Sequence, residues 1–421
     1  MQIASKCFHQ PNRLPIRSAI IASSYNAILK QQPQTTTTFQ YKYNLHRNFT
    51  TTEDDEVSKR RRRRLSVAIV GTGPSGMYTA KYLRSSILPK KQKQQQQQQQ
   101  QPSTKQNDSE VEEKLSKQQQ EDEYDLNIDM IEKLPTPYGL VRSGVAPDHP
   151  EVKSVEHDFD SVFTSSCTKM QFMGNVQVGI DVSLNELRDL YDVVVLAYGC
   201  ESDNKLGIDG EERLKGILSA REFVAWYNGH PNFVHIGEEL SKLLSSSNQP
   251  KQVVVIGQGN VALDCARILA KGKQGLIDTD IASHALDVIG DGIEKTIVLG
   301  RRGHVQGAFT IKELRELTKL KKEGHNVAFN VRQDELDMGA TPSTMKELNL
   351  PGARPKVRID KLLRDVAAAT DTTSGADTTT KEVDLRFLLQ PITFLPDELD
   401  PSRVGSLVCQ RTELKGEPRN Q

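Results

Sequence analysis

Long apolar runs are missing from this sequence of 421 residues, and their absence excludes a membrane-spanning helix. Such a helix needs about 18 consecutive apolar residues, and no stretch of the chain approaches that length. The longest early apolar patch, Ala19–Ala22, is too short even for the apolar core of a secretory signal. Only 36% of the residues are hydrophobic, and the shortage is concentrated in residues 1–64 and 89–123. The remainder is long enough to bury a substantial core.

Cysteine is scarce and never paired in sequence. The count of five is odd and no C-x-x-C occurs, which argues against a zinc ribbon, an iron–sulfur ligand set and a disulfide framework. We therefore expect no metal ligands among the cysteines. They stand at Cys7, Cys167, Cys200, Cys265 and Cys409.

Acidic residues are absent before Glu53, while residues 1–64 carry twelve Lys and Arg and four Asp and Glu. A basic, hydroxyl-rich and acid-poor start is typical of a mitochondrial transit peptide. We expect residues 1–64 to be a transit or disordered segment and the protein to reach the mitochondrial matrix or the matrix face of the inner membrane. A polar tail without a targeting role is the alternative. The run Lys59–Arg64 favours a solvated segment touching anionic lipid over a nuclear-import signal.

Because the whole chain is neutral, residues 65–421 carry a net charge of −8. A mildly acidic body gives no reason to expect a nucleic-acid partner. This part of the chain alternates short apolar runs with helical patterns, which predicts an α/β fold with parallel sheets. A polar, glutamine-rich stretch at 90–120 predicts a solvated loop. Strands are predicted at 65–70, 124–131, 170–174, 176–178, 193–196, 253–256, 296–299, 385–389 and 404–410, and helices at 77–83, 152–165 and 261–270. The strands at 193–196, 253–256 and 296–299 are expected to be buried, and the last two strands to form a meander or hairpin.

The predicted strand at 65–70 ends in G-T-G-P-S-G, residues 71–76, and a helical pattern follows. In such a turn the glycines let the backbone approach a pyrophosphate, and the helix N-terminus supplies N–H donors and positive partial charge. Glu132 ends the next strand and can accept both ribose hydroxyls, which favours an adenosine without a 2′-phosphate. The glutamine-rich loop explains why Glu132 lies further from the turn than about 20 residues. An ordinary glycine-rich turn is the alternative.

A second turn, G-Q-G-N-V-A at 257–262, also follows an apolar strand and opens a helix. Here the next strand ends in Arg301 and Arg302, whose guanidinium groups suit a 2′-phosphate. A solvated basic turn is the alternative. The two turns predict one site for FAD and one for NADPH, and hydride transfer between nicotinamide and flavin. We expect an FAD-binding domain at 65–200, with a disordered insert at 89–123, and an NADP-binding domain at 201–421.

Longer motifs in the same order resemble the mitochondrial NADPH–adrenodoxin (ferredoxin) reductases. They are 67–80, 131–153, 174–182, 193–199, 257–269 and 298–317. The resemblance implies two doubly wound Rossmann-like domains, the NADP domain inserted into the FAD domain. It also implies an acidic [2Fe–2S] ferredoxin as electron acceptor and a possible peripheral contact with the inner membrane.

Site residues follow from the resemblance. It implies that Gly71, Gly73, Pro74, Ser75, Gly76, Glu132, Leu140 and Val176 contact FAD, and that Gly257, Gln258, Gly259, Asn260, Arg301, Arg302 and Glu313 contact NADP. His149 and Asp264 match a pair near the flavin, with a role in orienting a donor or relaying a proton, or in a structural hydrogen bond between loop and helix. Arg315 matches a ferredoxin-docking position, and a basic cluster stands at Arg354, Lys356 and Arg358.

The sequence departs from the family after the NADP domain. Family members return to the FAD domain with a segment that carries glycine-tryptophan and glycine-proline pairs, and the only tryptophan here is Trp226. We expect a fragment, a truncated gene model or a poor enzyme that retains FAD weakly. A non-catalytic nucleotide-binding protein is one alternative. A flavin disulfide reductase is another, although it needs a reactive cysteine pair after the first helix.

Overall fold

The computed structural model describes residues 19–20, 63–87, 124–163, 169–200, 203–245, 251–290, 293–370 and 381–420. The predicted insert at 89–123 and most of the predicted leader lie outside these residues. The chain divides into two compact units, which are described separately. Unit 1 comprises Met1–Tyr25, Arg142–Lys153 and Glu201–Gln421, and unit 2 comprises Asn26–Val141 and Ser154–Cys200. None of the helices in the described ranges is long and apolar enough to cross a membrane.

Unit 2 is built on a four-stranded parallel sheet in the order β4-β3-β2-β5. The predictions for 124–131 and 193–196 coincide with strands, and those for 65–70 and 170–174 are right to within two residues, because each is an apolar run that ends at a glycine or polar turn. The strands are β2 (Arg63–Val70), β3 (Tyr124–Ile131), β4 (Lys169–Met173) and β5 (Val193–Leu196).

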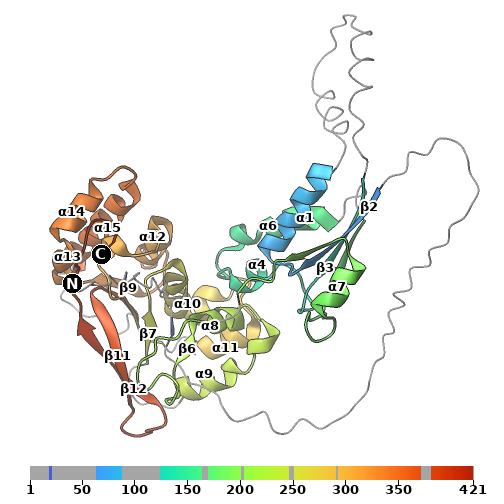
Figure 1. Ribbon diagram of the computed structural model, residues 1–421. Helices are drawn as coiled ribbons and strands as arrows, with labels where there is room; N and C mark the ends of the chain where they lie inside the picture. Colours follow the sequence, from blue (N-terminus) through green and yellow to red (C-terminus); the bar gives the residue numbers. More distant parts are fainter. Residues whose placement is uncertain are drawn as a thin grey trace, which may run out of the picture. The chain divides into compact units, whose positions relative to one another are not determined.

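Helices cover both faces of this sheet, as Figure 1 shows. Met77, Ala80, Phe159 and Val162 pack on one face and Leu187 on the other. The helix that carries Leu187 begins at a capping box between Ser183 and Glu186. The helices are α1 (Pro74–Ile87), α6 (Val155–Phe163) and α7 (Leu184–Leu190). A short helix, α4 (Leu140–Gly144), begins in unit 2 and ends in the segment Arg142–Lys153 of unit 1.

Three expectations for residues 152–196 are corrected. The helix predicted at 152–165 is two helices, α5 (Pro150–Lys153) and α6, because the chain turns at Ser154. The strand predicted at 176–178 is a turn with one isolated bridge between Val178 and Val182. β5 is parallel as predicted but not buried, since it forms an edge of the sheet and Val193 is 42% exposed.

Unit 1 contains a six-stranded sheet in the order β6-β1-β7-β8-β10-β9. β7, β8, β10 and β9 are mutually parallel, and β1 pairs antiparallel with both β6 and β7. The buried strand predicted at 253–256 and the strand at 296–299 are confirmed within β7 and β8. The strands are β1 (Ala19–Ile20), β6 (Leu218–Ser219), β7 (Gln252–Ile256), β8 (Lys295–Leu299), β9 (Val327–Val331) and β10 (Lys381–Arg386).

One large core joins the helices of unit 1 to this sheet. α10 contributes most of its length to that core, and its course is interrupted at Gly272, where φ is +61°. The helices are α8 (Ala220–Tyr227), α9 (Ile236–Ser245), α10 (Asn260–Leu276), α11 (Ser283–Ile289), α12 (Ile311–Lys319), α13 (Gln333–Gly339), α14 (Pro342–Leu348) and α15 (Arg354–Thr370). Two 3₁₀ turns are η1 (Pro231–Phe233) and η2 (His304–Gln306).

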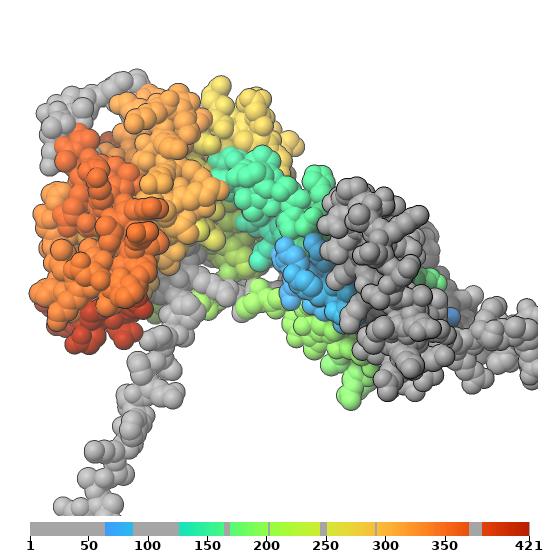
Figure 2. Space-filling model, turned by 90° about the horizontal axis from the view of Figure 1, so that it is seen from above, coloured from blue at the N-terminus to red at the C-terminus, as the bar shows by residue number. Residues whose placement is uncertain are grey.

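The chain then forms an antiparallel hairpin of β11 (Leu389–Pro396) and β12 (Val404–Arg411). Phe394 of β11 packs on Ile256 and Leu299, at the carboxyl ends of β7 and β8. The prediction of one strand at 385–389 is wrong. These residues include the end of β10, a parallel strand of the main sheet, and the start of β11, which is a separate strand. In Figure 2 the residues at the red end of the colour scale lie against the orange residues that precede them in the chain.

Candidate dinucleotide sites

The first glycine turn connects β2 to α1 in unit 2. Gly71 has φ +99°, and a Cβ there would lie 2.5 Å from the Ala197 carbonyl oxygen. A Cβ on Gly76 would overlap the Gly71 carbonyl, so α1 presses directly on the turn. A Cβ on Gly73 would meet nothing within 4 Å. Two glycines therefore close the turn, and the third borders open space at the N-terminus of α1, where a pyrophosphate fits.

Glu132 stands at the end of β3 beside this turn, as predicted. Its buried carboxylate accepts hydrogen bonds from the Thr72 backbone N–H (3.0 Å) and hydroxyl (2.7 Å). Thr72 was missed by sequence reasoning, because a turn threonine carries no distinctive signal. Val176 donates its N–H to the Glu132 carbonyl (2.9 Å), whereas the Leu140 side chain is exposed. The structure thus gathers Glu132, Val176 and the glycine turn, while Leu140 contributes an apolar surface of α4.

The second turn connects β7 to α10 in unit 1. Gly257 has φ +130° and donates its N–H to the Leu299 carbonyl (2.8 Å). Gly259 caps α10, and a Cβ there would meet nothing within 4 Å. Gln258 donates its side-chain amide to the Arg386 carbonyl (2.8 Å), and Asn260 accepts from the Thr310 N–H (2.8 Å). Open space again borders the helix N-terminus, so the turn fits a second phosphate group.

Arg301 and Arg302 follow β8 with both side chains exposed. Arg302 is exposed as a whole residue, but neighbouring protein atoms desolvate part of its guanidinium. This desolvation first, and then the charge of Arg301, lower the pKa of Arg302. Within the described ranges no carboxylate oxygen lies within 4.0 Å of either guanidinium. Thr412 fixes the turn by donating its hydroxyl to the Arg301 carbonyl (2.5 Å). Two cations held close together are suited to a dianionic phosphate.

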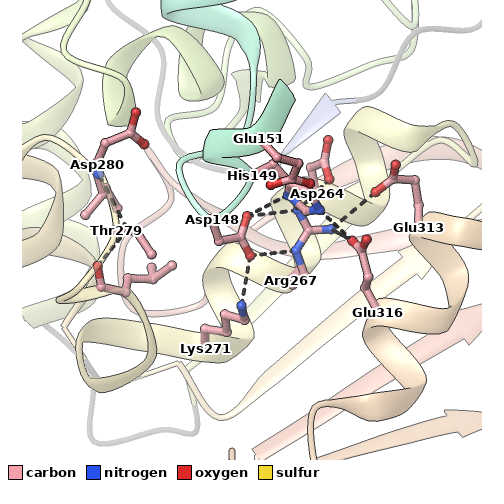
Figure 3. Close-up of polar contacts among 12 residues, drawn as sticks. Asp148, His149, Glu151, Asp264, Arg267, Lys271, Thr279, Asp280, Glu313 and Glu316 are labelled. Carbon is pink, nitrogen blue, oxygen red and sulfur yellow. Dashed lines mark hydrogen bonds and ion pairs between the residues drawn. The ribbon is translucent and has the colours of Figure 1, made fainter. Parts of the chain in front are cut away.

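A cluster of charged side chains lies on α10 around Arg267, whose side chain is only 2% exposed. Its guanidinium pairs with Asp148 (2.8 Å) and Asp264 (2.8 Å). Glu316 (3.1 Å) and Glu313 (3.6 Å) approach the same group from α12. Figure 3 shows the four carboxylates converging on one guanidinium. Burial of so many charges is tolerable only because each carboxylate faces the cation.

His149 joins this cluster through both ring nitrogens. Nδ1 lies 3.1 Å from Asp148 Oδ1, and Nε2 lies 3.0 Å from Glu316 Oε2. The hydrogen bond to Asp148 raises the pKa of His149 to about 9, with Glu316 adding to the effect against burial. Burial alone would raise the pKa of Asp148, but His149, Arg267 and Lys271 together hold it far below its usual range. The two carboxylates favour the protonated imidazole, while Arg267 Nη2, which can only donate, lies 2.9 Å from Nδ1 and opposes it.

Asp264 and His149, predicted as a pair, reach the same cluster. Burial raises the pKa of Asp264, and Arg267 only partly offsets the rise. Among the hydrogen bonds and ion pairs of the described residues none joins the two directly; both contact Arg267. Asp148, Arg267, Lys271 and Glu316 were missed by sequence reasoning. The available signal was the i,i+3 spacing of Asp264 and Arg267, which places both on one face of a helix.

Ligand atoms of His149, Glu313 and Glu316 all lie within 4.8 Å of one another, a spacing also found at metal sites. Arg267 already supplies positive charge there, since its guanidinium is 3.1 Å from Glu316. A divalent cation at this point would face that guanidinium across a short distance and be repelled. The grouping is therefore explained by the ion pairs of unit 1.

The predicted docking residues divide into two kinds. Arg315 on α12 and Arg354 and Arg358 on α15 are exposed. Lys356 instead pairs with Glu347, whose side chain is 1% exposed. The exposed arginines are available to a partner, whereas Lys356 stabilises the packing of α14 on α15.

Residues 65–338 match the family described as pyridine nucleotide-disulphide oxidoreductase. The chain is 41% identical over 353 residues to "NADPH:adrenodoxin oxidoreductase, mitochondrial" of Arabidopsis thaliana, covering 83% of this chain and 62% of that protein. The human protein of the same description is 37% identical, with 83% and 60% covered. The structure of Mycobacterium tuberculosis FprA in complex with NADPH superposes with a TM-score of 0.65 at 34% identity, covering 85% of this chain and 66% of that one.

The chain spans about three-fifths of the length of the curated relatives it matches. Two parallel sheets with Rossmann-like glycine turns agree with the FprA fold, and the predicted resemblance is confirmed. The chain therefore belongs to the pyridine nucleotide-disulphide oxidoreductase family, in the group that contains the adrenodoxin reductases and FprA.

Proposed function

We propose that this chain is an NADPH-dependent flavoprotein reductase, with FAD bound by unit 2 and NADP(H) by unit 1. The observation that carries the proposal is the contrast between the two glycine turns. Beside the first stands the acid Glu132, and beside the second stand Arg301 and Arg302. An acid selects a free ribose and a pair of arginines selects a 2′-phosphate.

The residues predicted from the motifs take these roles. The open position at Gly73 and the N–H groups of α1 would hold the FAD pyrophosphate, and Glu132 would accept the ribose hydroxyls. The open position at Gly259 would do the same for NADP. Further FAD contacts are Gly71, Pro74, Ser75, Gly76, Leu140 and Val176, and further NADP contacts are Gly257, Gln258, Asn260, Arg301, Arg302 and Glu313. We propose the domain limits given from the sequence, except that Arg142–Lys153 belongs with the NADP-binding unit. Residues 1–64 are proposed as the leader, within which Ala19–Ile20 pairs with β6 and β7.

When bound, FAD would accept a hydride from NADPH and release the electrons one at a time. The chain's own part is to orient the two nucleotides and to hold protons beside them. Asp148 and Glu316 lie beside the two ring nitrogens of His149 and raise its pKa, which favours the protonated ring. Burial favours the protonated form of Asp264 as well. We assign both residues a role in orienting a donor or relaying a proton near the flavin.

A disulfide reductase is the weaker assignment. Cys265 is fully buried, and that burial raises the pKa of its thiol. A thiol held in its neutral form attacks a disulfide poorly. Burial of Cys265 therefore argues against thiol exchange at that residue.

The proposed electron acceptor is an acidic [2Fe–2S] ferredoxin. The relatives' names mention ferredoxin and adrenodoxin, and Arg315, Arg354 and Arg358 present exposed positive charge. Location in the mitochondrion, with a peripheral contact to the inner membrane, is proposed from the acid-poor leader and from the mitochondrial relatives. FprA, a mycobacterial protein, is similar too. The proposed mitochondrial location therefore rests mainly on the acid-poor composition of residues 1–64.

The test is reconstitution of the full chain with FAD, followed by assay of NADPH-dependent reduction of an acidic [2Fe–2S] ferredoxin. With FAD supplied in excess, to offset the weak retention expected of this chain, we expect one FAD per chain and reduction that slows as salt screens the docking charges. If FAD is fully incorporated and ferredoxin is never reduced, the electron-transfer assignment is wrong and a nucleotide-binding role is left.

A further inference from the structure

Glu335, at the start of α13, is a fully buried carboxylate outside both glycine turns. Arg386 donates to its Oε1 from Nε (2.9 Å) and Nη2 (2.7 Å), and Arg411 donates from Nη1 (3.0 Å). The Phe387 N–H donates to Oε2 (2.7 Å). One acid thus joins the end of β10, the connection to β11 and the end of β12.

The residue after Phe387 is held in an unusual backbone conformation. Leu388 is buried and has φ +56°, a region that side chains other than glycine rarely adopt. Its N–H donates to the Arg302 carbonyl (3.1 Å), and its carbonyl accepts from the Thr412 N–H (2.9 Å). Strained residues persist where surrounding contacts fix them, and they concentrate at binding sites. Here the strained residue bonds directly to the arginine turn.

We propose that Glu335 is a positioning residue that gives the site its preference for a 2′-phosphate. The inference rests on the proposed NADP site. Glu335 fixes Phe387, Phe387 fixes Leu388 in its left-handed conformation, and Leu388 holds the backbone of Arg302. Arg411 adds a second connection by donating to the Phe387 carbonyl (3.2 Å).

The charge of Glu335 matters as much as its shape. Glutamine has one acceptor oxygen, so Glu335→Gln loses at least one of the four hydrogen bonds and places an amide beside two guanidinium groups. The connection between β10 and β11 then loosens, and the Arg301–Arg302 turn loses its fixed position. A nucleotide without a 2′-phosphate does not use that turn and should bind as before.

The experiment measures the affinities of adenosine 2′,5′-bisphosphate and 5′-AMP for the full chain by calorimetry. For Glu335→Gln we expect the bisphosphate to bind roughly tenfold more weakly, since charge-assisted hydrogen bonds depend on geometry, and the affinity for 5′-AMP to stay within about twofold. Glu382→Gln is the matched control. It makes the same change at the other end of β10, where Glu382 pairs with Lys295, and should alter neither affinity.

Two further variants distinguish an error in the proposed NADP site from an error in the role proposed for Glu335. Arg301→Gln with Arg302→Gln must lose the bisphosphate selectively; if it does not, the proposed NADP site and this inference both fall. If that variant behaves as expected but Glu335→Gln binds both ligands normally, or weakens both equally, only the role of Glu335 is wrong. Should Glu335→Gln not fold, Arg411→Met removes one donor from a half-exposed position and must show a smaller selective loss; its absence would overturn the inference.

Discussion

Arg301 and Arg302 carry the proposed choice of cofactor, and their replacement by glutamine tests it at the scale of single residues. Each charged hydrogen bond to a phosphate is worth about 1.5–3 kcal/mol. We therefore expect the double variant to bind NADPH at least about tenfold more weakly and NADH unchanged. Fluorescence titration with both nucleotides checks this. Equal loss for the two would mean that the pair has a structural role only.

Asp148 is predicted to be the largest single contribution to the charged cluster around Arg267. Asp148→Asn removes the carboxylate that accepts from both Nε and Nη2 of the buried guanidinium and from Lys271. Loss of one partner of a buried ion pair costs about 3 kcal/mol, and urea unfolding measures it. Asp280→Asn is the control, because Asp280 is 47% exposed in its pair with Lys153 and should cost less than about 1 kcal/mol. Similar values for the two variants would contradict the buried cluster.

His149 makes the stability of unit 1 depend on pH. Its pKa is about 9 in the folded protein and about 6.5 in an unfolded chain. The folded state thus binds the proton more tightly, and the stabilisation is fully present below about pH 6.5 and is lost as pH rises through 9. Asp148, Glu316, Glu313 and Arg267 are the charged groups that face the ring.

We expect the wild-type protein to lose about 1–2 kcal/mol of unfolding free energy between pH 6.5 and 9.5, after allowance for solvent screening. His149→Gln should lack this slope. Urea unfolding at several pH values compares the two proteins. Parallel pH curves would show that His149 is not protonated in the folded state.

Arg267 shows why part of the site escaped sequence reasoning. An arginine in an amphipathic helix usually lies in solvent. The i,i+3 spacing from Asp264 predicts a shared helix face but does not distinguish a buried pair from an exposed one. Arg267 can be buried because its guanidinium pairs with Asp148, which lies 119 positions away in the sequence. Glu132 and the arginine pair were predictable because each follows a strand whose end the sequence marks.

At the scale of elements, the glycines of the first turn predict two different outcomes. Gly76→Ala places a Cβ against the Gly71 carbonyl, which pushes α1 from β2 and should cost several kcal/mol, about 3 or more. Gly73→Ala meets no protein atom within 4 Å, so the protein should fold normally and lose FAD. Thermal unfolding and flavin content compare the variants. A folded Gly73→Ala protein that retains FAD would place the pyrophosphate elsewhere.

Strands were predicted well where apolar, β-branched runs end at glycine, as in β2, β7 and β8. The strand predictions were wrong where tertiary contacts decide the local structure. β5 has the composition of a buried strand but lies at a sheet edge. Residues 176–178 have apolar alternation, yet their backbone bonds go to the Glu132 carbonyl and into a turn. Residues 385–389 have the sequence pattern of a single strand, but the positive φ of Leu388 interrupts the extended backbone between β10 and β11.

At the scale of the whole molecule, residues Arg142–Lys153 group with unit 1, although the chain on either side belongs to unit 2. This segment carries Asp148 and His149 to α10. The sequence could not predict that this segment joins unit 1, because its place there depends on ion pairs between segments far apart in the chain. It also means that His149 shares a unit with the proposed NADP site.

The central claim is that one chain holds two dinucleotide sites of different preference. The most direct measurement is calorimetric titration of NADP⁺ into the chain already saturated with FAD. We expect one NADP⁺ to bind per chain with the same affinity as without FAD. This binding should be lost in Gly259→Ala and, measured without FAD, kept in Gly73→Ala. Abolition of NADP⁺ binding by FAD, or loss of both nucleotides in each variant, would show a single shared site and contradict the account.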